Sequence, residues 1–306
     1  MSLQYNILWL DDRIEEYQTL EIDTELKEYV ESLFFEPHIY MYESVDEAVQ
    51  NSTKRKYDVI FSDFNINENK TGKDFISDIR NKNVNAEVLF YSAQQTPPET
   101  GVDRISFLKL HSDTSYEDLK NKMKVVINLT VEKLNDLTNL RGLVMSEVSE
   151  LDDLMKTIVA SYCINSCEDE KELRNYIVGK IEKRIKESLD VSQVKCEKKC
   201  IHEWKNKTIQ KIVFEQNFDS YTTAGALNHI IEKKRLGIKQ FLSNYNTEII
   251  QNRNQLAHCK AELKEGGKEV LFTKNGEKEF STDEINKIRK NISKYHKMFE
   301  EIREKI

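Results

Sequence analysis

Two adjacent carboxylates, Asp11 and Asp12, come directly after the apolar run Ile7–Leu10. Adjacent carboxylates in a partly desolvated place repel each other, and one of them stays protonated unless a cation compensates for the charge. Mg²⁺ does this well because it takes oxygen ligands. The pair also fits a solvated loop that begins after a core strand, so other residues must distinguish a metal site from a polar turn.

Polar side chains end three other apolar runs in the first half of the chain. Asp63 ends the run VIFSD, Ser92 ends the run EVLFYS, and Lys109 ends the run ISFLK. Residues just past the carboxyl ends of parallel strands form one crevice, so these groups would converge there with the first carboxylate pair. An aspartate beside Mg²⁺ is a competent nucleophile for a phosphoryl group. Ser92 and Lys109 would then bond the new phosphate.

The first half of the chain has the pattern of a sheet that would hold these residues. Short apolar runs predict strands at 5–10, 38–42, 59–61, 88–91 and 105–108. Amphipathic stretches predict helices at 14–35, 45–51, 72–81 and from 116 onward. Strands that alternate with helices are typical of a parallel sheet covered on both faces. We therefore predict an α/β doubly wound, parallel five-stranded sheet.

This pattern over residues 4 to about 125 resembles the receiver domain of two-component response regulators, which has a flavodoxin-like fold. The resemblance implies that Asp11, Asp12 and Asp63 hold Mg²⁺, together with the backbone carbonyl of Asn65. It also implies that Asp63 is phosphorylated by a histidine kinase or a small phosphodonor. The turn NKTGKDFISDIR, which contains Gly72, resembles the family's loop into its third helix.

The same resemblance implies that Ser92 and Lys109 form a switch pair that responds to the phosphate. The sequence departs from the family here in two ways. The stretch QQTPPETGVD between the pair contains two prolines and a glycine, which predicts a shortened or missing fourth helix. Ser106 replaces the family's switch aromatic, with Phe107 beside it, and Leu110 replaces the usual proline after the lysine. We therefore expect phosphorylation at Asp63 with a rebuilt output face.

The composition is that of a two-domain protein of the cytosol. The chain has 306 residues, 39% of them hydrophobic and 32% charged, and its five cysteines are scattered. We expect no signal peptide and no membrane span. Residues 1–125 contain 14 basic and 24 acidic side chains, a net charge of −10, whereas the remainder contains 32 and 29, a net charge of +3. This asymmetry suggests different partners for the two halves.

A proline-free stretch from Tyr116 to about Cys163 joins the two halves. Its apolar spacing predicts one long helix or two nearly continuous ones. We place a receiver domain at 1–125, a helical linker at 126–141 and an α-helical effector domain at 142–306. Such a helix would transmit a change from the receiver, or it would merely connect the domains.

The second half is predicted to be a helical bundle with a small β insertion. Helices are expected at 142–164, 169–189, 199–216, 222–258 and 282–305. Ser281 and Glu284 match a capping box at the start of the last helix. The stretch EVLFTKNGEKEF before it predicts a hairpin around Asn275 and Gly276.

The motif NRNQLAHCK is the main chemical feature of this half. Arg253 and His258 are five residues apart, about 140° apart on an ideal helix, and would converge at a bend or a fraying end. A permanent cation, with Asn254 beside it, and a group that titrates near neutrality suit cleavage of an RNA phosphodiester. A solvated arginine with a helix-capping histidine is the structural alternative.

In its form RNQLAH, late in an all-helical domain, this motif resembles the HEPN superfamily of small helical ribonuclease domains. The resemblance implies metal-independent cleavage in a cleft between the two protomers of a homodimer. It also implies a polar residue from the domain's first helix, for which Ser146, Glu147 and Glu150 are candidates. We therefore predict a phosphorylation-regulated response regulator whose HEPN-like domain cleaves RNA. The alternative is a phosphorylation-gated dimerisation or docking adaptor without catalytic activity.

Two weaker patterns lie between these motifs. Cys196, Cys200 and His202 in CEKKCIH are close enough to suggest zinc, but the spacing is not that of a paired zinc site. Lysines around Trp204 would suit RNA by charge and stacking, or form a charged helix face over a buried ring. No helix-turn-helix pattern is convincing, which disfavours a DNA-binding regulator.

Overall fold

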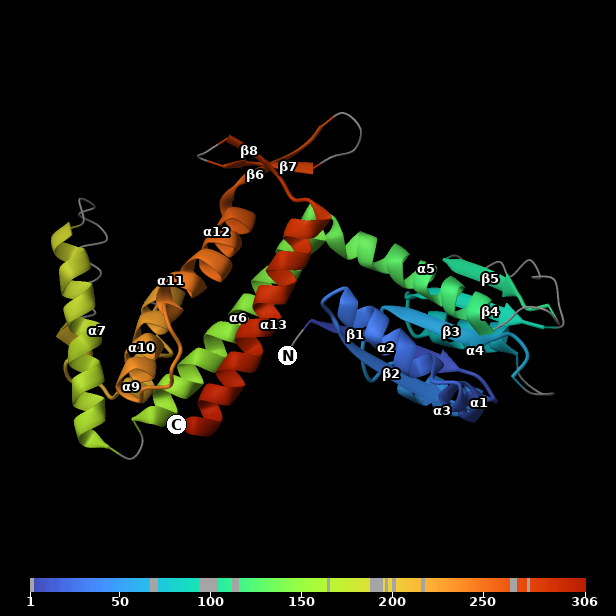
Figure 1. Cartoon of the computed structure of the whole chain (residues 1–306), viewed down its shortest axis with the longest axis horizontal. Coiled ribbons are helices and arrows are strands. Elements are labelled where there is room, and N and C mark those ends of the chain that lie inside the picture. Colours follow the sequence, from blue (N-terminus) through green and yellow to red (C-terminus); the bar gives the residue numbers. More distant parts are fainter. Residues whose placement is uncertain are drawn as a thin grey trace. The chain divides into compact units, whose positions relative to one another are not determined.

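The computed structural model describes residues 3–66, 71–93, 104–111, 116–163, 166–187, 195, 198–199, 202–215, 218–264, 269–273 and 276–306. The chain divides into two compact units, residues 1–140 and 141–306, which we call the sheet unit and the helical unit. Figure 1 shows the elements of each. No helix in these described ranges is long and apolar enough to cross a bilayer.

The sheet unit contains a five-stranded parallel sheet with the order β2-β1-β3-β4-β5. Its strands are β1 Gln4–Leu10, β2 Glu36–Tyr42, β3 Val59–Asp63, β4 Glu87–Ser92 and β5 Ile105–Lys109. This is the strand order of the flavodoxin-like doubly wound fold. The predicted fold class is therefore confirmed, and each predicted strand lies within an observed one.

Both faces of the central strands are buried, which explains their nearly continuous apolar sequences. On one face, Leu8 and Leu10 join a core under the helices α3 Val45–Asn51 and α4 Gly72–Asn81. The alternate residue Trp9 is also fully buried, on the opposite face. On that side α5 Tyr116–Asn135 contacts β3 and β4, and α2 Ile22–Ser32 packs against α5 and β2.

The predicted helix at 14–35 is two helices, α1 Ile14–Thr19 and α2 Ile22–Ser32. Between them Glu21 has a left-handed backbone, with φ of 56°. The apolar spacing accounts for the break, because Tyr17 and Ile22 are five residues apart and would lie about 140° apart on one continuous helix. Both side chains are buried, and the turn between the helices allows this.

The helical unit consists of helices with a separate antiparallel sheet. Its described helices are α6 Leu137–Tyr162, which begins in the sheet unit, α7 Cys167–Glu187, α9 Ile209–Ile212, α10 Ser220–Lys233, α11 Phe241–Tyr245, the π-helix η1 Asn246–Ile250, α12 Gln251–His258 and α13 Thr282–Lys305. Its strands, in the order β6-β7-β8, are β6 Lys260–Leu263, β7 Glu269–Thr273 and β8 Gly276–Glu279. The capping box predicted at Ser281 is present. Phe241, Tyr245, Tyr295 and Phe299 form a buried aromatic cluster in its core.

The predicted helix at 222–258 is interrupted after Lys233, and the chain becomes helical again only at Phe241. Gly237 lies in the gap with φ of 76°, and Arg235 and Gln240 also have positive φ. Glycine shortly after a helix is the usual residue for such a reversal. Here Arg235 takes that left-handed conformation directly after the C-cap Lys234, and Gly237 is the accompanying signal in the sequence.

The junction is helical, as predicted, in the form of two helices. α5 ends at Asn135 and α6 begins at Leu137, with a bend at Asp136 between them. The boundaries of the receiver domain, linker and effector domain stay predictions. The predicted loss of a fourth helix at 93–103, the zinc candidates Cys196 and Cys200, and Asn275 of the hairpin lie at least partly outside the described residues.

Gly72, the first residue of α4, packs against the end of β3. A Cβ atom at this position would lie 2.6 Å from the carbonyl oxygen of Asp63 and 2.8 Å from Cε1 of Phe90. Its N–H donates to the carbonyl oxygen of Phe64 at 2.9 Å. The close approach of α4 to the carboxyl end of β3 therefore requires a residue without a side chain.

We expect Gly72→Ala to lower the free energy of unfolding of the sheet unit by about 1–3 kcal/mol, because overpacking displaces backbone and an aromatic ring. Urea unfolding measures the change. Gly142→Ala in α6 is the control, because its new Cβ would meet no atom within 4 Å, and it should be neutral or stabilise by up to about 1 kcal/mol. Equal effects of the two substitutions would contradict the close approach.

Candidate functional site

Three carboxylates meet at the carboxyl edge of the parallel sheet. Asp11 and Asp12 follow β1, Asp63 ends β3, and one oxygen of each lies within 4.8 Å of the others. Asp11 is fully buried and Asp63 is 8% exposed, whereas Asp12 is exposed. Adjacent β1 and β3 bring these residues together from positions 52 apart in sequence. The sequence predicted this convergence, and the structure has it.

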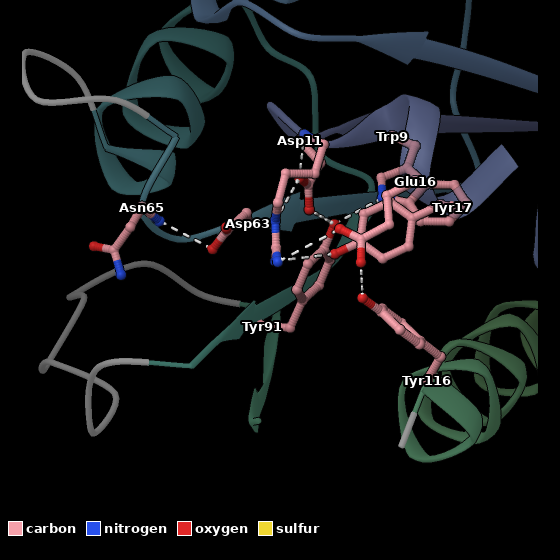
Figure 2. Close-up of polar contacts among 9 residues, drawn as sticks. Trp9, Asp11, Glu16, Tyr17, Asp63, Asn65, Tyr91 and Tyr116 are labelled. Atoms are coloured by element: carbon pink, nitrogen blue, oxygen red, sulfur yellow. Dashed lines mark hydrogen bonds and ion pairs between the residues drawn. The ribbon is translucent and has the colours of Figure 1, made fainter. Parts of the chain in front are cut away.

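Asp11 is fixed by hydrogen bonds to both of its carboxylate oxygens (Figure 2). The hydroxyl of Tyr91 donates to Oδ2 at 2.5 Å, and the backbone N–H of Arg13 donates to Oδ1 at 2.8 Å. The Arg13 guanidinium is 4.0 Å from Oδ1, and its side chain is about half exposed. Burial raises the pKa of Asp11, and the bonds from Tyr91, the Arg13 backbone and Tyr17 lower it.

Asp63 lies near the same charged groups as Asp11 but accepts fewer hydrogen bonds than Asp11 does. The backbone N–H of Asn65 donates to its Oδ1 at 3.1 Å. Burial raises the pKa of Asp63 to about 6, the Asn65 bond and Arg13 lower it, and the charges of Asp11 and Asp12 raise it. A carboxylate destabilised by burial and by two like charges gains from a nearby cation.

Ser92 and Lys109 lie next to each other at the ends of β4 and β5, where they are register partners. The Asn65 side chain donates to Ser92 Oγ at 2.8 Å, which ties Ser92 to the turn after Asp63. Lys109 is exposed, and the charged residues that shift the pKa of Asp63 are Asp11, Arg13 and Asp12. The structure thus links Ser92 to Asn65, two residues after Asp63, and the switch role of both residues stays a prediction.

Phe107 follows Ser106, the residue that stands where the receiver family has its switch aromatic. Its side chain is partly buried against the core. Its ring is 6.3 Å from that of Phe64, and it packs against the buried cluster under α3 and α4. The backbone N–H of Leu110 donates to the Ser92 carbonyl oxygen at 2.8 Å, so β4 and β5 remain paired beyond Lys109. Phe107 therefore has a packing role on the face opposite Trp9 and Tyr91.

The sequence pattern did not identify three residues of the site, Arg13, Tyr17 and Tyr91. Arg13 directly follows the carboxylate pair, so its proximity was available from the sequence. Tyr91 immediately precedes Ser92, and strand alternation directs the two side chains to opposite faces. A tyrosine in an apolar strand resembles a core residue, which is why its hydroxyl was overlooked.

The donor set of this site fits Mg²⁺. The ion takes oxygen ligands, often from one or two carboxylates together with water, and three carboxylates of different exposure converge here. Each carboxylate oxygen has two lone pairs, so the hydrogen bonds to Asp11 leave acceptor capacity on both oxygens. The ligand role predicted for the Asn65 carbonyl stays a prediction.

In the helical unit, Arg253 contacts residues of two other helices. Its Nη2 donates to Ser220 Oγ of α10 at 3.2 Å, and the Ser220 hydroxyl bonds the carboxylate of Asp152 in α6. Burial raises the pKa of Asp152, while Ser220 and the charge of Arg253 lower it. Asp152 is thus the acidic residue of α6 that interacts with Arg253, and it was not among the predicted candidates.

The other predicted residues of this motif lie elsewhere. His258 and Asn254 are exposed on α12, and Ser146 is exposed on α6. Glu147 is buried and lies 3.5 Å from Nε2 of His296 in α13. The catalytic roles of Arg253, His258, Asn254 and Glu147 stay predictions.

No family model matches the chain, and no curated protein matches it. Among solved structures, a Vibrio cholerae chemotaxis protein CheY4 is 20% identical, with a TM-score of 0.31, and the match covers 40% of this chain and 98% of that one. The receiver domain of Francisella response regulator 1452 is 18% identical, with a TM-score of 0.32, and the match covers 42% of this chain and 99% of that one. A two-component response regulator from Clostridium difficile is 20% identical, with a TM-score of 0.30, and the match covers 41% of this chain and 97% of that one. The fold assignment rests on strand order and register.

We expect Asp63→Asn to change how stability depends on pH in the absence of divalent cations. The pKa of Asp63 is raised to about 6 in the folded protein. The protonated carboxyl therefore stabilises the folded state, an effect that is present below pH about 4 and is lost as the pH rises through about 6. The wild type should therefore lose about 2–3 kcal/mol of unfolding free energy relative to the variant between pH 4 and 7.

Urea unfolding of both proteins at a series of pH values measures this difference. Repeating the series with Mg²⁺ should reduce it, because a cation stabilises the ionised carboxylates. Parallel pH profiles for wild type and variant in chelator would contradict the predicted destabilisation of the Asp63 carboxylate.

Proposed function

We propose that this chain is a phosphorylation-regulated response regulator in which Asp63 accepts a phosphoryl group. The observation that carries the proposal is the position of Asp63 at the carboxyl edge of the sheet, within 4.8 Å of the carboxylates of Asp11 and Asp12. Phosphoryl transfer uses a divalent cation to compensate charge on the transferred group, and these carboxylates could hold one. The donor would be a histidine kinase or a small phosphodonor.

Asp63 acts as the nucleophile in this proposal. With a pKa of about 6 its carboxylate is mostly ionised at neutral pH. The Asn65 N–H bonds Oδ1, which leaves Oδ2 to attack phosphorus. A bond forms between Oδ2 and phosphorus, the bond from phosphorus to the donor's leaving atom breaks, and the leaving group takes that electron pair. The product is an acyl phosphate on Asp63.

Asp11 and Asp12 would hold Mg²⁺, with Asp63 and the Asn65 carbonyl completing the site. When bound, the ion supplies positive charge that compensates the carboxylates and the phosphoryl oxygens. Ser92 would donate its hydroxyl to a phosphoryl oxygen, since its own oxygen already accepts from Asn65. Lys109, exposed on the neighbouring strand, would supply an ammonium group to another.

The helical unit would be the effector domain. A second function proposed for the chain is metal-independent RNA cleavage by this unit as a homodimer. Arg253 favours this candidate because a hydrogen bond to Ser220 holds its guanidinium in place. Its helix α12 also follows the π-helix η1 directly, and π segments often occur at functional sites. Arg253 would bind the phosphodiester, and His258 would transfer the proton. Without this activity, the unit would serve as a docking or dimerisation module.

Phosphorylation of Asp63 is tested with acetyl phosphate and Mg²⁺, followed by intact-mass spectrometry. We expect one phosphoryl group on the wild type, none on Asp63→Asn, and slower labelling of Asp12→Asn. Asp58→Asn is the matched control, because burial also raises the pKa of Asp58 to about 6, yet Asp58 precedes β3 at the opposite edge of the sheet. Labelling of Asp63→Asn at the wild-type rate would rule out Asp63 as the acceptor.

RNA cleavage is tested with total RNA and tRNA in chelator, with and without prior phosphorylation. We expect His258→Ala to reduce the rate by about a hundredfold or more, because a general acid or base contributes that much. His202→Ala, another exposed histidine of the helical unit, should not. If no lane shows cleavage and phosphorylation shifts the oligomeric state, the docking module replaces the nuclease.

A further inference from the structure

A buried tyrosine links the indole of Trp9 to the carboxylate of Asp11. The Trp9 Nε1–H donates to the Tyr91 hydroxyl oxygen at 2.7 Å, and the Tyr91 hydroxyl is 2.5 Å from Asp11 Oδ2 (Figure 2). All three residues are 0% exposed. The chain of contacts crosses from β1 to β4 on the sheet face opposite the core under α3 and α4.

The direction of these hydrogen bonds follows from the groups involved. An indole N–H only donates, so the Tyr91 oxygen accepts from Trp9. The single hydroxyl hydrogen of Tyr91 is then available to Asp11, whose ionised carboxylate only accepts. Trp9 thereby directs the phenol as a donor toward Oδ2.

The phenol is held on its ring face as well as at its oxygen. The Tyr17 ring lies 6.4 Å from the Tyr91 ring and 5.0 Å from the Trp9 ring, in edge and tilted arrangements. Together with the Arg13 N–H on Oδ1, these contacts fix the rotation of the Asp11 carboxylate.

The donor that holds Asp11 is neutral. A tyrosine hydroxyl ordinarily has a pKa of about 10, so the phenol carries its proton and no charge at neutral pH. A buried lysine or arginine in this place would orient Asp11 but also cancel the charge that attracts a cation. The phenol orients the carboxylate and leaves that charge in place.

We infer that Tyr91, held by Trp9, is a positioning residue for Asp11 that sets the affinity of the acidic site for a divalent cation. The inference rests on the proposed function, since it concerns the same site. Groups that bond a metal-ligating side chain orient it, and their loss typically weakens metal binding about ten- to a hundredfold. Because Trp9 is bonded to the phenol, its fluorescence reports on the occupancy of the site.

The test is Mg²⁺ binding to the full chain, measured by titration calorimetry. Tyr91→Phe removes only the hydroxyl oxygen, and we expect its Kd for Mg²⁺ to rise about ten- to a hundredfold. Tyr5→Phe is the matched control, since Tyr5 is a fully buried residue of the same sheet whose hydroxyl bonds Thr130 instead. Its Kd should equal that of the wild type.

Fluorescence gives a second readout that a purely structural role would not move. Trp9 and Trp204 are the two tryptophans of the chain, and Trp204 lies in the helical unit, bonded to Glu215. The emission change on adding Mg²⁺ should occur in the wild type and be absent in Trp9→Phe, which retains Trp204. In Tyr91→Phe it should shift to higher Mg²⁺ concentration.

If Tyr91→Phe does not fold, calorimetry on Trp9→Phe decides, because this variant keeps the phenol but removes the donor that directs it, and its Kd should rise severalfold. Wild-type affinity in Tyr91→Phe, or in Trp9→Phe where that variant decides, overturns the inference and leaves the proposed function intact. An equal loss in Tyr5→Phe also overturns it. Absence of Mg²⁺ binding in the wild type overturns the proposed metal site together with the inference.

Discussion

Repulsion among three carboxylates at one edge of a sheet is the constraint on which the site depends. Asp11 is fully buried beside Asp63, and the nearest guanidinium, that of Arg13, is 4.0 Å away on a side chain about half exposed. The charge of Asp11 is stabilised mainly by neutral donors, which are the phenol of Tyr91, the backbone N–H of Arg13 and the phenol of Tyr17. Hydrogen bonds of this kind stabilise an ionised group without neutralising it. The one positive charge of Arg13 offsets only part of the charge of the three carboxylates, so the site keeps a negative potential.

The sheet supplies the rigidity that holds these charges in place. Its central strands are buried on both faces, so neither β1 nor β3 can shift register without exposing apolar side chains. The same packing brings α4 against the end of β3, where Gly72 is in contact with the Asp63 carbonyl. The capping box of Thr71 and Asp74 fixes the first turn of α4 at that point. A strained electrostatic arrangement is thus supported by apolar and backbone contacts formed elsewhere.

The strands and the carboxylate cluster were predictable because each apolar run ends in a polar residue, and parallel topology then sets their common edge. What the sequence pattern missed depends on interactions across the fold. The Tyr91 hydroxyl bonds Asp11, 80 positions away, and Arg253 interacts with Asp152 through Ser220. Local periodicity describes one helix or strand at a time, so it does not predict contacts between residues of different elements. The end of α10 was different, because Gly237 close behind it was visible in the sequence.

In the helical unit, the positions of Arg253 and His258 on one helix limit how they could act together. Residues five apart on a helix lie about 140° apart, and Arg253 and His258 both belong to α12. Arg253 is held by Ser220 on α10, while His258 is exposed at the end of the helix. One copy of the helix therefore presents these two groups in different directions. A phosphodiester site that uses both is most simply completed by a second copy of the chain, so that dimer formation and catalytic activity would arise together. Cleavage of RNA, and not the oligomeric state, would therefore separate a nuclease from a docking or dimerisation module.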